Sequence, residues 1–398
     1  MFIINKNEEK NMADKNKTSS PIGESFHIKK GEPIKNIFNR ETIHNGALVI
    51  QSIYSSFDVD GFVNSIIDET WESLELKARG RQITLKLGKY LPSDYQEGIA
   101  ILEKVAAGYS SGLFVLGGSF PDFVEVYGQD EGNWNISINA LEIFTKLWSS
   151  EFAVRPFILK DEECMMQQML EWAGSENEHT RRLASEGCRP ALPWAIALPK
   201  FKKDPTPILP ILTQLKTDPS MYVRKSVANN LNDISKTCPE LVMQLAKDWY
   251  GENEYTDWIV KHGCRTLLKR GNSEVLAIFG YNSSASIDVT GFALESKNIS
   301  MGEDLNFSFL VAVKEATKVR LEYAIDYVKA RGKRNRKIFQ ISEISMKENQ
   351  KKAYVKAHSF ADVSTRKHYP GVHSITLIVN GKEKGTLDFE VTKQEELS

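Results

Sequence analysis

The chain has 398 residues, 41% of them hydrophobic, and its 51 basic residues nearly balance 52 acidic ones. A chain of this length supports more than one hydrophobic core, so we expect two domains. The formal charge of −1 excludes an argument for nucleic-acid or membrane binding from total charge alone. The four cysteines are far apart and form no CxxC pair, which indicates neither a structural zinc site nor a disulfide framework.

The chain begins with an apolar run, Met1 to Ile4, that is too short for a signal peptide. No run of 18 apolar residues follows anywhere in the sequence. We therefore expect a cytoplasmic protein that neither spans a membrane nor is exported. Residues 1–20 carry few apolar side chains after this start, so we predict a flexible N-terminal arm there.

Residues 21–282 have the apolar spacing of helices, separated by loop signals such as Asp218-Pro219-Ser220. Three amphipathic stretches in this region, at 181–187, 223–230 and 259–265, resemble one another. Aligning Thr180, Val223 and Ile259 gives separations of 43 and 36 residues, the spacing of stacked antiparallel helix pairs. We predict an all-α solenoid of HEAT-like repeats.

A solenoid presents one concave face, which is lined by residues that share a register in successive helices. In this sequence the shared register mixes basic side chains, carboxylates and amides: Arg182, Glu186, Asn229, Asp233, His262 and Arg265. We interpret such a groove as one that binds a polyanion and also carries out a reaction.

The pattern changes after residue 282 to segments that alternate or are β-branched, which predicts strands. The predicted strands are 287–294, 305–313, 319–327, 337–341, 352–357, 371–379 and 385–391, with Asn380-Gly381 as a hairpin turn between the last two. These strands suit an immunoglobulin-like sandwich over residues 287–398. Residues 288–398 hold 19 basic and 15 acidic side chains, so basic character is concentrated there.

Five segments together carry a resemblance to a known family: 121–128, 150–157, 181–195, 223–233 and 258–271. With the two patterns described above, the chain resembles an AlkC-type alkylpurine DNA glycosylase, a HEAT-like-repeat enzyme of DNA alkylation repair, in the form with a C-terminal immunoglobulin-like domain. The resemblance implies base excision repair of cationic alkylated bases, 3-methyladenine and also 3-methylcytosine. It further implies double-stranded DNA as the partner, a monomer, and no metal or organic cofactor.

Carboxylates are the side chains that such a reaction needs. An N3-alkylated purine is already a good leaving group, and its departure leaves an oxocarbenium-like sugar that negative charge stabilises. Matching the family's motifs assigns Glu151, Glu186 and Asp233 to a catalytic cluster, with Arg182 beside them. Which carboxylate contacts the sugar or positions the water stays open.

Two tryptophans are candidates for contact with the lesion. Trp194 follows Pro190 and Pro193 and is predicted to offer a ring face to a cationic base, with a core plug between repeats as the alternative. Trp258 shares a helix face with His262 and Arg265, and for it a core position is equally compatible. Asp122 and Glu125 fit a capping role at the start of a helix better than a site.

Basic residues along both domains are predicted to contact the DNA backbone. In the helical part these are Arg155, Arg189, Arg224, His262, Arg265 and Lys269. In the sandwich, the stretch 329–337 holds six cations at an expected turn, and Arg331, Lys333, Arg334 and Arg336 are predicted to grip DNA there. A solvated edge loop is the alternative for that stretch.

Two other functional classes compete with a monofunctional glycosylase. One is a catalytically inert HEAT-repeat scaffold that binds DNA or protein, and the other is an adaptor that uses the sandwich for protein partners. Carboxylates favour the enzyme, because negative charge in a DNA-binding groove opposes phosphate binding and is useful where a cation forms.

Overall fold

The computed structural model describes residues 32–108, 114–282, 284–330, 332–362 and 367–393. The predicted N-terminal arm lies outside these residues. By contacts between Cα atoms the chain forms two compact units: residues 1–188 with 192–198, and residues 189–191 with 199–398. The division therefore falls within the helical part, because the last helices contact the sandwich. Among the described residues, no helix has the length and apolar character needed to cross a membrane.

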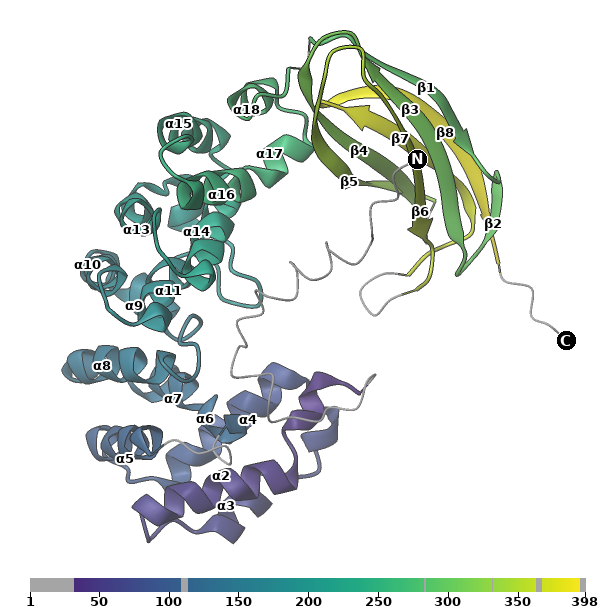
Figure 1. Ribbon diagram of the computed structural model, residues 1–398. Coiled ribbons are helices and arrows are strands. Elements are labelled where there is room, and N and C mark those ends of the chain that lie inside the picture. The colour runs from purple at the N-terminus through teal and green to yellow at the C-terminus, as the bar shows by residue number, and fades with distance from the viewer. Residues whose placement is uncertain (1–31, 109–113, 283, 331, 363–366, 394–398) are drawn as a thin grey trace, which may run out of the picture. The chain divides into compact units, whose positions relative to one another are not determined.

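The regular elements among the described residues of the first unit are all helices. Its elements are η2 (Ile34–Ile37), α2 (Arg40–Ile53), α3 (Val59–Ile66), η3 (Trp71–Ser73), α4 (Leu76–Tyr90), α5 (Tyr95–Ala107), α6 (Phe114–Gly117), α7 (Phe120–Tyr127), η5 (Glu131–Asn133), α8 (Trp134–Thr145), α9 (Val154–Lys160), α10 (Glu162–Ala173) and α11 (Glu178–Gly187). Helices α5, α8 and α10 form one layer, and α7, α9 and α11 lie beside them in a second layer (Figure 1).

The second unit continues the helical repeats. It contains α12 (Pro199–Lys203), η6 (Thr206–Ile208), α13 (Leu209–Leu215), α14 (Met221–Ile234), α15 (Pro239–Trp249), α16 (Glu254–Gly263), α17 (Arg265–Lys269) and α18 (Ser273–Ile278). Helix α14 packs along α16, while α13 and α15 cover their other side (Figure 1). This two-layer stacking is the HEAT-like solenoid that the spacing predicted.

The helix starts define the true repeat register. Asn177, Ser220 and Asn253 occupy the residue before α11, α14 and α16, so the repeats are 43 and 33 residues apart. The predicted second separation of 36 residues is wrong. Thr180 and Val223 lie three residues after their caps, and the equivalent residue after Asn253 is Thr256, not Ile259. Ile259 lies three residues later on the same helix, and both side chains are fully buried.

A β-sandwich follows the helices, as predicted. Its strands are β1 (Ile287–Leu294), β2 (Asn298–Ser300), β3 (Asp304–Val313), β4 (Thr317–Val328), β5 (Arg334–Met346), β6 (Lys351–Ser359), β7 (Gly371–Val379) and β8 (Lys382–Thr392). One sheet has the order β1-β3-β6 and the other β2-β8-β7-β4-β5. All neighbouring pairs are antiparallel except β2 with β8. The three-residue strand β2 was not predicted, because it is too short to show alternation.

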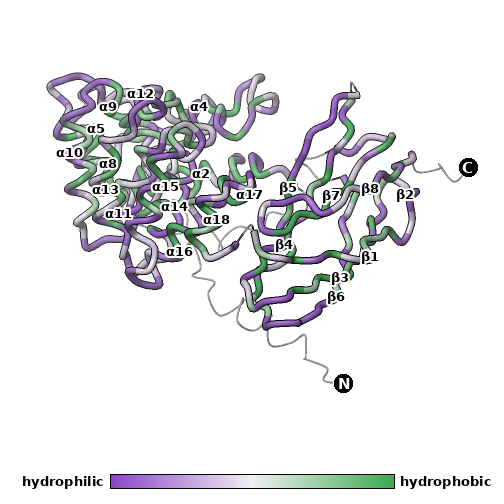
Figure 2. The backbone as a smooth tube through the Cα atoms, turned by 90° about the horizontal axis from the view of Figure 1, so that it is seen from above, coloured by the Kyte–Doolittle hydropathy of each residue, from purple (hydrophilic) through white to green (hydrophobic). Residues whose placement is uncertain are grey.

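The sandwich core comes from alternate residues of the facing strands. Strand β3 alternates from Leu305 to Val313, with every second side chain buried. Figure 2 colours the chain by hydropathy, and hydrophobic and hydrophilic stretches alternate along the helices and strands. Elements that bury one face and expose the other have this pattern.

The β7–β8 hairpin joins the sandwich to the helices of the second unit. Asn380 and Gly381 have φ angles of 44° and 76°, which fits the predicted two-residue turn. The Asn380 amide donates hydrogen bonds to the backbone oxygens of Asn282 (3.0 Å) and Lys318 (3.1 Å). At the tip, the backbones of Gly381 and Gly271 approach so closely that a Cβ on Gly271 would lie 2.9 Å from the Gly381 oxygen.

Candidate functional site

Two predicted catalytic carboxylates lie together in the first unit. Glu151 begins the turn before α9, and Glu186 lies in the last turn of α11. Arg182 pairs with both: one guanidinium nitrogen binds Glu151, and the other lies 3.5 Å from Glu186. The hydroxyl of Ser149 donates to Glu151 at 2.8 Å and accepts from Arg182 at 2.8 Å. We call these four residues the carboxylate cluster.

The carboxylate cluster is mostly shielded from solvent, and its carboxylates outnumber its guanidinium. Side-chain exposure is 15% for Glu151, 14% for Arg182 and 6% for Glu186. Two carboxylates and one guanidinium carry a formal charge of −1. Electrostatic interactions are stronger in such partly buried places than in water, so this charge can stabilise a nearby cation. A solvated surface pair at Arg182 and Glu186 is therefore not what the structure contains.

Trp194 projects from an irregular segment that follows α11. Its side chain is 75% exposed, which excludes the alternative of a core plug. Its φ of 65° lies in the left-handed region, an uncommon conformation for a large side chain. The Lys77 amine donates to the Trp194 carbonyl at 2.6 Å and lies 4.8 Å from the centre of the Phe152 ring. The unit therefore holds this backbone so that the indole faces outward.

Arg155 holds the same segment through hydrogen bonds to backbone oxygens. Its side chain is fully buried and donates to the backbone oxygens of Ile196 (2.6 Å) and Gly187 (2.7 Å). The prediction that Arg155 contacts the DNA backbone is wrong, because a guanidinium without exposed surface cannot reach a phosphate. Its role is to fix the chain on both sides of Trp194.

The third predicted catalytic carboxylate, Asp233, lies in the second unit. One of its oxygens accepts from Arg189 at 2.8 and 2.9 Å, and the other pairs with Lys236 at 2.8 Å. Asp233 is 4% exposed and Arg189 8%. Arg189 therefore forms a buried ion pair with Asp233, and its contact with the DNA backbone stays a prediction.

Arg224 is also buried, and its contact with the DNA backbone stays a prediction. Its guanidinium donates to the carbonyls of Asp218 (2.8 Å) and Pro219 (2.9 Å) and lies 4.0 Å from the centre of the Tyr255 ring. These contacts close the loop before α14.

A cavity of about 360 Å³ lies in the second unit between helices and sandwich. We call it the basic pocket. It is lined by the predicted residues Trp258, His262, Arg265 and Lys269, together with Lys261, Leu268, Arg320, Gln340 and Glu343. Its charged side chains, four cations and Glu343, give a formal charge of +3 with His262 neutral. The pocket therefore suits an anion.

The basic pocket is held by an aromatic pair and an ion-pair network. The rings of Trp258 and His262 stack at 4.9 Å with an interplanar angle of 7°. Glu343 on β5 pairs with both Lys261 of α16 and Arg320 of β4. Burial alone would raise the pKa of Glu343, but its bonds from Lys261 and Tyr281 keep it lowered. Burial, with Arg265 and Lys225, lowers the pKa of His262 to about 4, so its ring is neutral at pH 7.

The predicted basic stretch of the sandwich is partly neutralised. The backbone N–H of Lys329 donates to the Lys333 oxygen, and Arg334 and Arg336 already belong to β5. Arg336 pairs with Glu383 at 2.7 Å, and Arg334 donates to Ser374 at 2.8 Å. Lys333 is exposed, while Arg331 lies outside the described residues. The contact of these four residues with DNA stays a prediction.

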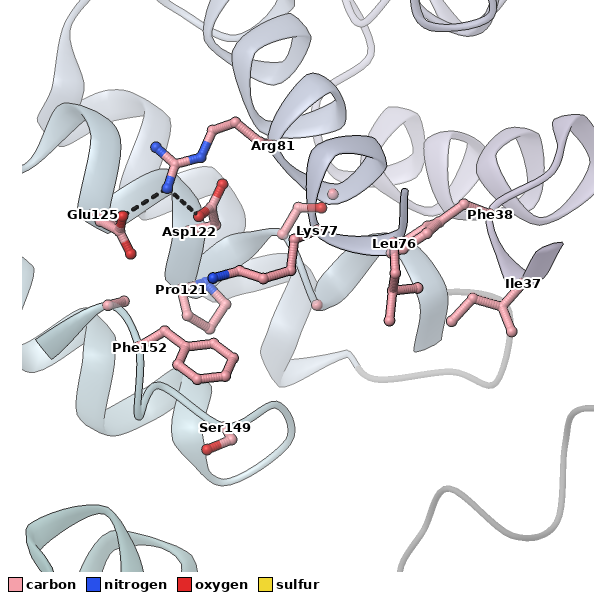
Figure 3. A pocket seen from close by; sticks show the side chains of 14 residues that line it. Ile37, Phe38, Leu76, Lys77, Arg81, Pro121, Asp122, Glu125, Ser149 and Phe152 are labelled. Atoms are coloured by element: carbon pink, nitrogen blue, oxygen red, sulfur yellow. Dashed lines mark hydrogen bonds and ion pairs between the residues drawn. The ribbon is translucent and has the colours of Figure 1, made fainter. Parts of the chain in front are cut away.

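Another cavity, of about 270 Å³, lies in the first unit (Figure 3). We call it the Phe152 pocket. Arg81 of α4 pairs there with Asp122 (2.9 Å) and Glu125 (2.6 Å) of α7. The structure thus corrects the capping interpretation of these two acids. Burial, opposed by the bond from Arg81, raises the pKa of Glu125.

Sequence reasoning missed Lys77, Arg81 and Ser149. Lys77 and Arg81 lie one turn apart on α4, whose sequence has ordinary helical spacing. Their partners are 41 or more residues away, so no local pattern marks them. Ser149 lies two residues before Glu151 and directly before the segment 150–157. Its position beside that segment is the one signal by which it could have been found.

Comparison with known proteins gives two family matches within the chain. Residues 148–267 match the family described as "DNA alkylation repair enzyme". Residues 288–393 match the family described as "Uncharacterised protein YhaZ, C-terminal Ig-like domain". The first match contains the carboxylate cluster and Trp194, and the second covers the sandwich.

Two relatives are similar over most of the chain. "Uncharacterized protein YhaZ" of Bacillus subtilis (strain 168) is 48% identical over 358 residues, which cover 90% of this chain and 99% of that protein. The solved structure of Pseudomonas fluorescens alkylpurine DNA glycosylase AlkC, bound to DNA containing an abasic site analog, is 36% identical with a TM-score of 0.86. That match covers 91% of this chain and 100% of the other.

Proposed function

This chain belongs to the AlkC-type family of DNA alkylation repair glycosylases, and from that premise we propose that it excises cationic alkylated bases from double-stranded DNA. We infer 3-methyladenine as the main substrate and 3-methylcytosine as a second one. The product is an abasic site, and the attacking nucleophile is water. DNA as the partner is supported by the solved relative, which is bound to DNA containing an abasic site analog.

The observation that carries the proposal is the pair of carboxylates in the carboxylate cluster. Glu151 and Glu186 share one guanidinium, Arg182, in a partly buried position. Where the N-glycosidic bond breaks, positive charge moves from the base to the sugar, and a preorganised negative group there lowers the barrier. A carboxylate of the cluster accepts the proton of the attacking water.

The exposed indole of Trp194 supports selection of charged lesions. An aromatic face attracts a cation by roughly 0.5–2 kcal/mol, while a neutral base gains less. Because the mechanism relies on the base's own charge, neutral bases with poor leaving ability are expected to be weak substrates. The carboxylates lower affinity for phosphate locally, so backbone contacts are assigned to other surfaces.

The basic pocket is the proposed surface for backbone phosphates. Its formal charge of +3 and its exposed Lys269 suit an anion, and phosphate contacts dominate the affinity of DNA-binding proteins. Glu343 holds Lys261 and Arg320 in place rather than opposing the phosphate by itself. Lys333 adds exposed charge on the sandwich.

The test is release of free base from methylated duplex DNA by the intact chain, Glu186→Gln and Glu274→Gln. Glu274 is an exposed residue of α18 paired with Lys247, so its variant is the matched control. We expect 3-methyladenine release by the intact chain and the control, and loss of release with retained DNA binding in Glu186→Gln. Absence of release by all three, with DNA bound, would instead support an inert scaffold.

A further inference from the structure

We propose that the Phe152 pocket is a binding site for the free, neutral purine base after it leaves the sugar. This inference rests on the proposed function and names where the product goes. The residues that carry it are Lys77, Gly80, Arg81, Asp122, Glu125 and Phe152.

The first step of the argument is the charge of the base before and after cleavage. In the lesion the alkylated base is a cation. When the bond from its nitrogen to the sugar carbon breaks, the electron pair of that bond stays on the base and cancels its charge. The water oxygen then bonds to the sugar carbon, and its proton passes to a carboxylate. The departing base is therefore neutral, and a site that receives it needs no net charge.

The Phe152 pocket has that property. The charged side chains that line it are two cations, Lys77 and Arg81, and two carboxylates, Asp122 and Glu125. Their formal charges sum to zero, and Arg81 bridges both acids. The carboxylate cluster, by contrast, carries −1 and favours the cation. Cleavage thus removes the positive charge by which the carboxylate cluster attracts the base. The neutral base that results has no electrostatic reason to prefer the cluster over an uncharged pocket.

Shape and lining also fit a single base. A cavity of about 270 Å³ lies just below the usual range for ligand sites, roughly 300–1,000 Å³, which favours a base over a whole nucleotide. Figure 3 shows the Phe152 ring, Pro121 and Leu76 around the space, with the acids at one side. Phe152 and Lys77 both line the pocket, and the Lys77 amine lies 4.8 Å from the centre of the Phe152 ring. A flat base has an aromatic surface to stack on and acceptors for its amino group.

The pocket adjoins the carboxylate cluster through one residue. Ser149 lines the pocket, and its hydroxyl is also hydrogen-bonded to Glu151 and Arg182 of the cluster. Phe152, likewise in the pocket wall, follows Glu151 directly in the chain. A base released at the cluster has a receiving site in the same unit.

The test is direct binding of free 3-methyladenine to the intact chain by calorimetry, without DNA. A filling variant is available because Gly80 lines the pocket and a Cβ there would be 3.9 Å from the Phe38 ring, an ordinary contact. Gly80→Leu is therefore the variant that should fill the cavity, since its first side-chain atom meets no close neighbour. Gly132→Leu is the matched control, since a Cβ at Gly132 has nothing within 4 Å and the residue is not in the pocket.

We expect 3-methyladenine to bind the intact chain and Gly132→Leu equally, and Gly80→Leu at least about tenfold more weakly. Phe152→Leu, which keeps the volume apolar but removes the flat ring, is expected to weaken binding about tenfold. Inorganic phosphate is the comparison ligand and should not compete with the base. Circular dichroism checks that each variant is folded.

Failure of this inference is distinct from failure of the proposed function. Base release from DNA with no measurable binding of free 3-methyladenine, or with equal binding by Gly80→Leu, would overturn the pocket and leave the glycosylase. Displacement of the base by phosphate would also overturn it, because the site would then be an anion site. Binding of the base without any release from DNA would support the pocket while contradicting the enzyme.

Discussion

Helices α11 and α16 belong to different units but begin and end with the same residue types. Each follows an asparagine, Asn177 or Asn253, whose side chain accepts from two backbone amides of the first turn. Each helix ends in a buried glycine, Gly187 or Gly263, followed by a buried cysteine. The positions five and nine residues after the cap carry Arg182 and Glu186 in α11.

In α16 the same two positions carry Trp258 and His262. The first pair contributes to a cluster with a charge of −1, and the second lines a pocket with a charge of +3. The comparison teaches that the repeat determines where side chains are placed, while the residue type at each position decides the chemistry.

The largest expected effect is a difference in excision rate between variants at these two equivalent positions. Glu186→Gln removes charge from the carboxylate cluster, and we expect the excision rate to fall about 10²- to 10³-fold. His262→Gln, at the same register, exchanges a neutral ring for a neutral amide and should change the single-turnover rate less than about fivefold. Single-turnover kinetics at saturating enzyme measure both. Similar losses in the two variants would show that the register itself matters more than the charge.

The segments that follow the two helices provide the next test. After α11 the chain is irregular and relies on Arg155, whereas after α16 it continues directly into α17. Arg155→Met leaves two backbone oxygens without their buried donor, so we expect a loss of about 3 kcal/mol of unfolding free energy. Urea denaturation measures it, with Arg40→Met on the exposed surface as the control, expected within about 0.5 kcal/mol of the intact chain. A loss below about 1 kcal/mol would contradict the assigned role.

The smallest expected effect concerns salt. Lys269→Gln removes an exposed cation of the basic pocket and should reduce the slope of log affinity against log salt by about 0.9. His262→Gln should leave that slope unchanged at pH 7, because a pKa of about 4 keeps the ring neutral. The ring gains a proton only as the pH falls toward this value, so the slope should be constant between about pH 6 and 8. Fluorescence anisotropy with unmodified duplex DNA measures the slopes, and a lower slope for His262→Gln at pH 7 would mean that the ring is charged in the complex.

The sequence predicted what depends on local pattern. Strands β1 and β7 have the predicted bounds, and the Asn380-Gly381 turn follows from the need for positive φ at both positions. The pairing of Arg182 with Glu186 follows from four-residue spacing on one helix face. In each case the determining residues are within a few positions of one another.

What could not be predicted depends on burial and on contacts between distant segments. Arg155 looks like an exposed cation in sequence, but helix packing buries it against carbonyls from residues 187 and 196. Lys77 reaches a carbonyl 117 residues away. The basic pocket needs β4 and β5 beside α16, which neither helix nor strand periodicity reveals. Burial of a charged residue is known only once its neighbours are placed.

The contact of Gly271 with Gly381 limits how this protein can be rearranged. Two backbones meet there without side chains, and both glycines have positive φ, so substitution at either one meets the other segment. The sandwich is therefore not an interchangeable module that begins at its first strand. A recombination event or a designed fusion that transfers it to another solenoid must also carry residues 271–282. Without them the β7–β8 hairpin loses its contacts with Gly271 and Asn282.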